Sequence, residues 1–408
     1  MMTRRRPARV QALRGIGVDT MGAIADQQTQ NASPRTSSSS LLRMENLDTD
    51  IPPPTVAASI TAQSATSDQE NSYLPFIGQL GLRNAAATHV SAMAGNVVSY
   101  TGEKNCVISA GGLSGILNTL LATVEMGDGV VLTDPTYSGL INRVKLAGGI
   151  PVLVPFDFVP GGAWMFDREK FRAVVETSEA KITAMLLMSP ALPSGAVLDQ
   201  GDWEVVAEVC VEHDILLILD AAMERLLFDG RRVDHPASMP GMAQRTITIG
   251  SASKELRMIG WRVGWIVGPE QLIADIALVG MANVVVPVGI AQKAAQAALE
   301  RSGEDISSFV DELQARRDVC MEELAGLPVG VPAGGWSFVL RVDGLGWTGS
   351  KAAEELLRHG VCVTPMDGWG IEHGSQYVRF VFSNEPCERL KGLGAKVRAA
   401  LVKSEHIV

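Results

Sequence analysis

The most informative part of the chain reads Ser251-Ala252-Ser253-Lys254 and, a few residues later, Gly260-Trp261-Arg262-Val263-Gly264. It follows an apolar run at 246–250 that has the length and composition of a buried strand. A lysine placed after such a strand among small residues loses hydration, which lowers its pKa and favours a neutral, nucleophilic amine. Arg262 offers a planar fork of donors for a phosphate, and Ser251 offers a hydroxyl. An exposed lysine is the usual alternative, but it leaves these neighbours unexplained.

Apolar runs of similar length recur on the N-terminal side of this segment and just after it. Between residues 86 and 287, amphipathic helical patterns such as 115–124 and 203–212 lie between several of them. The strand candidates are 106–109, 130–133, 150–155, 184–188, 215–219, 246–250 and 263–267. Buried strands alternating with helices predict an α/β fold with a mostly parallel sheet. Ligands bind at the carboxyl ends of such strands, so the residues that follow each strand are the candidates for a site.

The pattern changes after residue 287, which predicts a second, smaller domain. Two long helical stretches come first, then shorter strands and a closing helix, at 291–300, 307–324, 337–342, 362–364, 377–382 and about 386–403. We therefore expect a large domain at 86–287 and a smaller α+β domain formed by 44–85 and 288–408.

The first 43 residues differ in composition from the rest of the chain. They hold seven arginines and two aspartates, with a serine run at 37–40. This composition predicts a flexible basic tail at residues 1–43. An Arg-rich, Ser-rich start is also typical of an organelle transit peptide, which remains an alternative.

The bulk composition excludes several classes of protein. A chain of 408 residues with 46% hydrophobic and 20% charged residues is typical of a globular enzyme. The net charge of −10 argues against nonspecific binding to nucleic acid or to an anionic membrane. Five cysteines without a C-x-x-C spacing predict reduced thiols rather than disulfides or a metal site. With no apolar run long enough to span a membrane, we expect a cytoplasmic protein.

Three of the predicted strands end in residues that could bind a ligand. Gly111 and Gly112 follow the first strand and open a helix, where free N–H groups attract anions, although a plain strand–helix turn would look the same. Tyr137 follows the second strand and could stack on an aromatic ring or simply pack. Asp220 ends the strand at 215–219 and needs a partner there, either a protonated ring nitrogen, a helix N-terminus or a structural cation.

A further candidate lies in the last predicted strand. Arg379 is flanked by apolar residues in the alternating segment 377–382. A guanidinium in such surroundings should have an anionic partner. The carboxylate of a substrate and an internal carboxylate are the two possibilities.

Together these segments resemble the fold type I enzymes of the aspartate aminotransferase superfamily, the class I/II aminotransferases, which use pyridoxal 5′-phosphate (PLP). The resemblance covers roughly residues 44–403. It implies that Lys254 forms the Schiff base with PLP and that Asp220 pairs with the ring nitrogen. It also implies contacts of the phosphate, the ring and the substrate carboxylate with Arg262, Ser251, Gly111, Gly112, Tyr137 and Arg379.

A motif near the start of the resemblance implies a homodimer. Tyr73, Gly78 and Leu82-Arg83 match a family pattern in which the tyrosine reaches the phosphate bound by the neighbouring subunit. Tyr73 is therefore expected to contribute to the partner's site.

Two positions depart from the family pattern. Leu192 stands where the family usually has an asparagine, and Met223 stands where it usually has a tyrosine. Both usual residues donate hydrogen bonds to the 3′-oxygen of PLP, and neither leucine nor methionine can. Loss of these donors should raise the pKa of the Schiff base. Water, Ser189 or Ser194 could substitute, or the reaction could differ from ordinary transamination.

The resemblance implies an aminotransferase in which the freed Lys254 acts as general base, and the kinetics are ping-pong between an L-amino acid and a 2-oxo acid. The segment 281–287 carries no charge, which favours a neutral or hydrophobic amino acid. A β-lyase, racemase, decarboxylase or cyclase is the alternative that Leu192 and Met223 leave open. A PLP-binding transcription regulator would need a DNA-binding module, for which the N-terminal segment is too short. A degenerate relative without cofactor would not need Lys254, Asp220 and Arg262.

Overall fold

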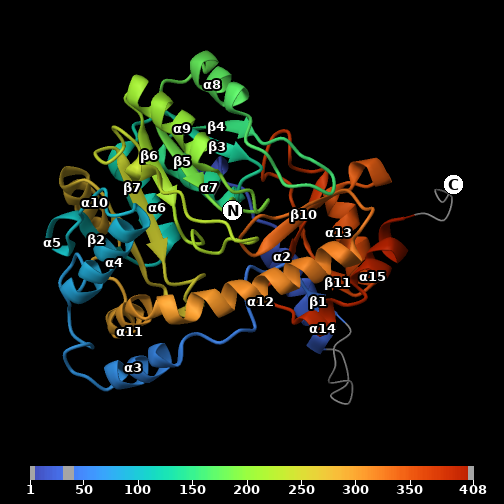
Figure 1. Ribbon diagram of the computed structural model, residues 1–408, viewed down its shortest axis with the longest axis horizontal. Helices are drawn as coiled ribbons and strands as arrows, with labels where there is room; N and C mark the ends of the chain where they lie inside the picture. The colour runs from blue at the N-terminus through green and yellow to red at the C-terminus, as the bar shows by residue number, and fades with distance from the viewer. Residues whose placement is uncertain (1–4, 31–40, 403–408) are drawn as a thin grey trace.

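The computed structural model describes residues 5–30 and 41–402. A seven-stranded sheet forms the core of the large domain (Figure 1). The strand order is β2-β8-β7-β6-β5-β3-β4, with β8 antiparallel to both of its neighbours and the other pairs parallel. The strands are β2 (Cys106–Ser109), β3 (Gly129–Asp134), β4 (Ile150–Pro155), β5 (Ile182–Met188), β6 (Leu216–Asp220), β7 (Thr246–Ser251) and β8 (Gly264–Val267). The predicted α/β fold with a mostly parallel sheet is confirmed.

Helices cover both faces of this sheet because successive side chains of each strand point to opposite sides. In β3, Val130 and Leu132 pack into one apolar cluster, whereas Val131 packs into another. The first cluster is covered by α6 (Gly112–Thr123), α7 (Ser138–Ala147) and α10 (Glu270–Asn283). The second is covered by α8 (Arg168–Thr177) and α9 (Gln200–Glu212). Short turns of helix lie at α5 (Gly102–Asn105), Pro236–Ser238 and Ile259–Trp261.

The smaller domain is built on a four-stranded antiparallel sheet with the order β12-β13-β10-β9. Its strands are β9 (Val329–Gly330), β10 (Ser337–Arg341), β12 (Thr364–Pro365) and β13 (Tyr377–Val381). A separate parallel pair joins β1 (Leu42–Arg43) to β11 (Val361–Cys362). The helices are α12 (Ser302–Glu323), α13 (Gly349–Arg358), α14 (Cys387–Leu390) and α15 (Leu393–Leu401), with a 3₁₀ turn at Asp343–Leu345. The predicted closing helix is split because Gly392 adopts φ +88° between α14 and α15.

The predicted domain boundaries differ from the packing. Helices α3 (Thr55–Ala65), α4 (Leu80–Met93) and α11 (Gly289–Glu300) share an apolar cluster with β2 and β8 of the large sheet. Their alanine-rich faces therefore pack on the large domain. The prediction places α3 and α11 in a small domain formed by 44–85 and 288–408. The long helix α12 follows α11 directly and leads across to the small domain (Figure 1).

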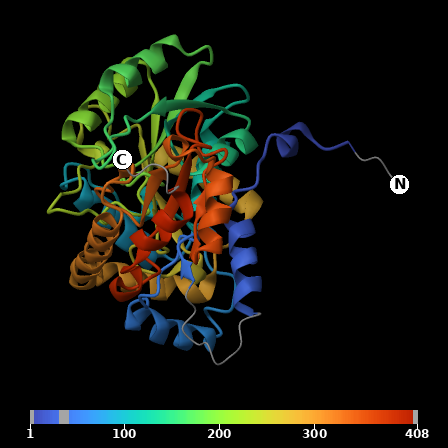
Figure 2. The same ribbon diagram turned by 90° about the vertical axis from the view of Figure 1, so that its right-hand side faces the viewer.

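The N-terminal segment also differs from the prediction of a flexible tail at 1–43. Helix α2 (Val18–Gln30) packs beside β11 and β12, with Met21 and Ala25 buried (Figure 2). A short helix, α1 (Ala8–Gln11), precedes it, and β1 pairs with β11. Two apolar residues on one face of α2 do not by themselves predict a packed helix, because seven arginines dominate the composition of residues 1–43. The serine run 37–40 lies outside the described residues.

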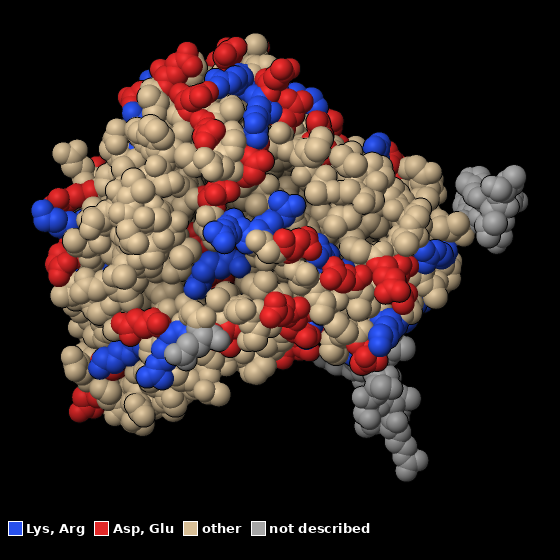
Figure 3. All heavy atoms as spheres, viewed as in Figure 1, with Lys and Arg blue, Asp and Glu red and all other residues tan. Residues whose placement is uncertain are grey.

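Surface charge is mixed in sign on the face seen in Figure 3, with a few basic side chains near its centre and acidic ones around them. Within the described residues, no helix is long and apolar enough to cross a membrane. The five cysteines are free thiols, and all but Cys387 are buried.

Candidate active site

A cavity of about 300 Å³ opens at the carboxyl ends of β6 and β7, between the two domains. It brings together residues that lie up to 267 positions apart and that we predicted separately from the sequence. The predicted residues that line it are Gly112, Tyr137, Asp220, Ser251, Lys254, Arg262 and Arg379, together with Leu192 and Met223. The cavity is where parallel-sheet topology predicts a ligand site.

Lys254 lies in the turn that follows β7, and its amine faces the cavity. Its Nζ donates a hydrogen bond to the carbonyl of Leu47 at 2.7 Å and lies 4.7 Å from the ring centroid of Trp336. Burial lowers the pKa of Lys254 to about 7, with Asp48 raising it and Arg379 lowering it further. A substantial fraction of the amine is therefore neutral near pH 7, as a nucleophile or base requires.

Asp220 ends β6 with its carboxylate in the cavity. Burial raises its pKa to about 6, against the opposing effect of the N–H of Ala222, which donates to Oδ1 at 3.2 Å. Asp220 makes no ion pair with any described residue. A buried carboxylate without a cationic partner can accept one from a ligand.

An anion-binding corner forms where α6 begins. Gly111 has φ +86°, and a Cβ added to it would lie 2.6 Å from Nη2 of Arg262. Gly112 is the first residue of α6 and lies against Ser251. Arg262, itself at φ +54°, donates to Ser253 Oγ at 3.3 Å and has no carboxylate partner among the described residues. Free helix N–H groups, hydroxyls and an unpaired guanidinium together favour a phosphate.

Arg379 lies buried on β13 at the other side of the cavity. Its Nη2 donates to Thr364 Oγ1 at 3.0 Å and to the carbonyl of Glu45. Its Nε has no hydrogen-bond partner in the described part of the chain, and burial lowers its pKa to about 10. The Glu45 carboxylate pairs instead with Arg43. The sequence left two possible partners for Arg379, a substrate carboxylate and an internal carboxylate. Among the described residues, no internal carboxylate pairs with it.

Tyr137 and Arg379 are joined by Trp369. The rings of Tyr137 and Trp369 meet edge to face at 5.3 Å, and the Arg379 guanidinium lies 4.9 Å from the Trp369 ring. Asp134 fixes this arrangement because its carboxylate accepts the N–H groups of residues 371 to 373 at 2.8–3.1 Å. The turn that carries Tyr137 is thereby tied to the small-domain loop that carries Trp369.

Leu192 and Met223 both line the cavity, as their positions in the sequence implied. The two serines considered as substitutes do not. Ser189 Oγ accepts the N–H of Leu198 at 3.0 Å, and Ser194 Oγ accepts that of Ala196 at 3.2 Å. Because neither serine lines the cavity, neither replaces the missing donors.

Several cavity residues carried no recognisable signal in the sequence. Ile16, Val18 and Asp19 come from the N-terminal segment, and Asn46 and Leu47 come from the segment before α3. Tyr73, by contrast, is predicted but lies outside the cavity, with 86% of its surface exposed. None of the described residues forms a cluster of three or more His, Cys, Asp or Glu that could hold a metal ion.

Sequence comparisons identify relatives over most of the chain. The profile of the family Aminotransferase class I and II matches residues 42–392. The chain is 33% identical over 338 residues to the arginine–pyruvate transaminase of Pseudomonas aeruginosa, covering 81% of this chain and 82% of the relative. It is 31% identical over 320 residues to aromatic-amino-acid aminotransferase 2 of Thermococcus litoralis, covering 76% and 79%.

Solved structures give the same result for the fold. N-succinyldiaminopimelate aminotransferase from Mycobacterium tuberculosis matches with a TM-score of 0.87 and 26% identity, covering 97% of this chain and all of the other. Aspartate aminotransferase from Thermus thermophilus with maleate matches with a TM-score of 0.85 and 27% identity, covering 98% and 100%. The fold is therefore of the aspartate aminotransferase type, as expected. The chain belongs to the class I and II aminotransferase family, whose enzymes transfer amino groups from amino acids to 2-oxo acids with PLP.

Proposed function

We propose that this aminotransferase holds PLP in the cavity around Lys254. Three features of the residues present fit this cofactor. The glycine corner beside Arg262 leaves space that any Cβ would fill and offers donors for a phosphate. Asp220 is a buried carboxylate free to pair with a protonated ring nitrogen. The Lys254 amine lies in the same cavity with a lowered pKa, ready to combine with an aldehyde.

PLP when bound supplies an electron sink for the bond broken at the substrate Cα. Asp220 would pair with the ring nitrogen and keep it protonated, and Tyr137 supplies an aromatic side chain to the same cavity wall. Arg379 orients the substrate by its α-carboxylate through the free edge of its guanidinium. Lys254, once released by the incoming amino acid, would take the proton from the substrate Cα and pass it to C4′ of the cofactor, as transamination requires. The single observation that carries this proposal is the meeting of Lys254, Asp220, Arg262 and Arg379 around one cavity.

The lining of the cavity supports a neutral or hydrophobic amino acid as substrate. Much of the wall is apolar, from Ile16, Val18, Leu47, Leu113, Leu140, Met188, Leu192, Met223 and Ile259. The described cations of the lining are Lys254, Arg262 and Arg379, each with a proposed role, so no further cation faces a second carboxylate. Asp19 at the mouth would repel an acidic side chain.

We also propose a homodimer, supported by an exposed apolar surface near Tyr73. Phe76, Val284 and Val285 line one hollow and remain between 38% and 50% exposed. Gln292 links their two segments: its side chain accepts the N–H of Gln79 at 2.8 Å and donates to the carbonyl of Pro287 at 3.2 Å. Apolar surface of this kind marks a protein interface. A partner docked here would cover Tyr73 or receive it in its own site.

The free thiols support a reducing compartment, and we propose the cytoplasm. A targeting role for the N-terminal residues remains the alternative, to be tested by the location of the tagged full-length chain.

A screen of single amino acids tests the proposed reaction. The protein loaded with PLP is mixed with each L-amino acid, and the spectrum of the bound cofactor is followed together with the 2-oxo acid formed. Conversion of the aldehyde form to the amine form, reversed by a 2-oxo acid, is the expected result. Release of ammonia or carbon dioxide, or inversion at Cα, would instead indicate the lyase, decarboxylase or racemase chemistry that Leu192 and Met223 leave open.

A further inference from the structure

The segment 41–51 connects the small domain to the two principal charged groups of the cavity. The carbonyl of Glu45 accepts a hydrogen bond from Arg379, and the carbonyl of Leu47 accepts one from Lys254 Nζ at 2.7 Å. Asn46 and Leu47 also line the cavity. The position of this segment therefore determines which acceptor the released Lys254 amine meets.

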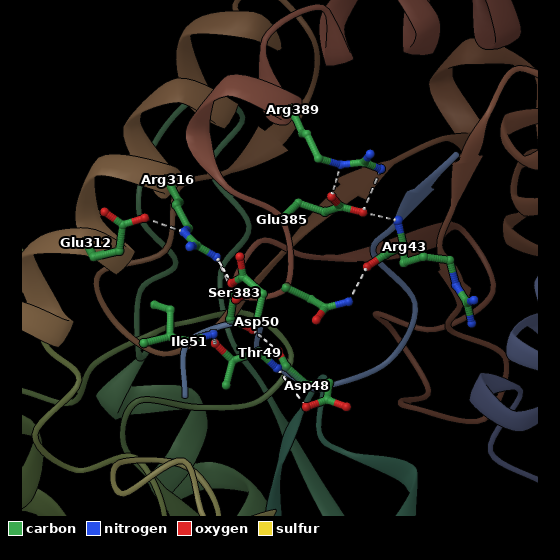
Figure 4. A network of polar contacts seen from close by, with 11 residues as sticks. Arg43, Asp48, Thr49, Asp50, Ile51, Glu312, Arg316, Ser383, Glu385 and Arg389 are labelled. Atoms are coloured by element: carbon green, nitrogen blue, oxygen red, sulfur yellow. Dashed lines mark hydrogen bonds and ion pairs between the residues drawn. The ribbon is translucent and has the colours of Figure 1, made fainter. Parts of the chain in front are cut away.

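The first half of segment 41–51 is anchored to the small domain (Figure 4). Its strand β1 pairs with β11, and the N–H of Arg43 donates to Glu385 at 2.6 Å. Thr364 Oγ1 donates to the Glu45 carbonyl at 2.7 Å. These contacts fix the chain as far as Glu45.

The second half is held by Arg316 of α12 and by Ser383, the second residue after β13 (Figure 4). Nη1 of Arg316 donates to Asp50 at 2.6 Å and to the carbonyl of Ser383 at 2.8 Å. The hydroxyl of Ser383 in turn donates to the carbonyl of Asp48. The Arg316 side chain is only 3% exposed and its contact with the Ser383 carbonyl is buried, so water competes little for that contact, whereas Asp50 is 39% exposed.

We propose that Arg316 and Ser383 are positioning residues for the transamination: together they fix the peptide between Leu47 and Asp48, so that the Leu47 carbonyl orients the released Lys254 amine for proton transfer. This inference rests on the proposed function of Lys254 as the base. Ser383 donates to the carbonyl of Asp48, the residue after Leu47, and Arg316 contacts both Ser383 and Asp50. The chain is therefore held on the C-terminal side of the Leu47 carbonyl.

The chemistry of a neutral amine explains why this acceptor matters. The amine has two N–H bonds and one lone pair, and donation of one N–H to a fixed carbonyl limits where the lone pair points. Proton transfer depends steeply on such alignment. The charged groups that face Lys254 are Asp48, Asp220, Arg262 and Arg379, and its described hydrogen bond goes to none of them but to the Leu47 carbonyl.

Two substitutions that conserve net charge test the proposal, each with a matched control. S383A removes the hydroxyl that holds Asp48, and its control S91A removes another buried hydroxyl that donates to a backbone carbonyl, in α4. R316K removes the guanidinium that contacts Asp50 and Ser383. Its control R317K changes the next residue of α12, which is similarly buried but contacts Asp229 and Pro332.

The first readout is the half-reaction of the PLP-loaded enzyme with an amino acid, with hydrogen or deuterium at Cα. S383A and R316K should slow it about tenfold with little change in KM, because a misplacement of about 1 Å costs this much or more. The isotope effect on the rate should rise in both variants, because proton transfer becomes more limiting. The two controls should match the wild type. Slowing without a larger isotope effect, or equal slowing in the controls, would overturn the proposal.

The second readout does not depend on turnover. Cofactor-free protein captures PLP through neutral Lys254, so the rate of capture rises with pH around the pKa of that amine. The Leu47 carbonyl favours the protonated amine, so S383A and R316K should shift the midpoint of capture downward by about half a pH unit or more. An unshifted midpoint in both variants would overturn the positioning role. If the two variants show this shift but the wild type reacts with no amino acid, the proposed function is refuted and the positioning of Lys254 is not.

Discussion

The lowered pKa of Lys254 should make the cofactor-free protein less stable at neutral pH than at alkaline pH, and a substitution can isolate this effect. Burial lowers the pKa from 10.5 to about 7. Below pH 7 the amine is protonated in both the folded and unfolded states, and the folded state carries the full cost of holding a cation there. Above about pH 10.5 it is neutral in both states and the cost is absent. The free energy of unfolding should therefore rise as pH increases from 7 to 10.5.

The substitution K254M removes this titration while filling a similar volume. A fall from 10.5 to about 7 corresponds to about 5 kcal/mol, at 1.36 kcal/mol for each pKa unit. The side chain opens onto the cavity, where water reduces the cost, so we expect about 2 to 4 kcal/mol. K254M should therefore be more stable than the wild type at pH 7 by that amount, relative to their difference at pH 10.5. The lost hydrogen bond to Leu47 adds an offset that changes less with pH.

Urea unfolding of the cofactor-free proteins, at one protein concentration and a series of pH values, measures the effect. All other titrating groups are shared by the two proteins and cancel in the difference. K181M, at an exposed lysine, is the control and should follow the wild type at every pH. A difference between K254M and wild type that stays constant from pH 7 to 10.5 would refute the reasoning, because it would mean that the folded protein does not penalise the protonated amine.

Four further substitutions test the cavity and the dimer interface. R262Q should weaken retention of PLP about ten- to a hundredfold, since a charge-assisted contact to the phosphate is lost, as measured by loss of cofactor absorbance on gel filtration. R379Q should lower kcat/KM for every amino acid by about tenfold or more while the cofactor stays bound, because the substrate carboxylate loses its cationic partner; loss of the cofactor would contradict this. The variant L192N/M223Y restores two donors to the cavity wall and should lower the pH at which the bound-cofactor spectrum titrates, and an unchanged titration would show that other groups already supply them. Y73D should shift the sedimenting species toward the monomer if Tyr73 lies in the dimer interface.

Much of the large domain could be predicted because most of its strands are buried on both faces, the partly exposed edge strand β4 excepted. The runs 106–109 and 150–155 coincide with β2 and β4, since a continuous apolar segment of that length between helical patterns has few other structures open to it. The convergence of Asp220 and Lys254 followed from the same topology, because both come after strands whose carboxyl ends lie at one edge of the sheet.

The small domain was less predictable because its elements are short and its contacts are distant in sequence. The predicted strand 362–364 is in fact two strands, β11 and β12, which belong to different sheets on either side of Val363. Two-residue strands have no periodicity to detect. The alanine-rich face of α11 likewise fits either domain, and only packing against β2 and β8 assigns it to the large one.

The sequence by itself predicted the mostly parallel sheet, and it singled out Lys254 and the glycine–arginine corner as candidates for a site, because hydrophobic pattern and strand-end residues can be recognised within short segments. Only the tertiary structure decided what surrounds the amine. The Leu47 carbonyl reaches Lys254 from 207 positions away, and Arg316 reaches Asp50 from 266. Backbone carbonyls are common to every residue and carry no sequence signal, so their use as acceptors depends on where the fold places them.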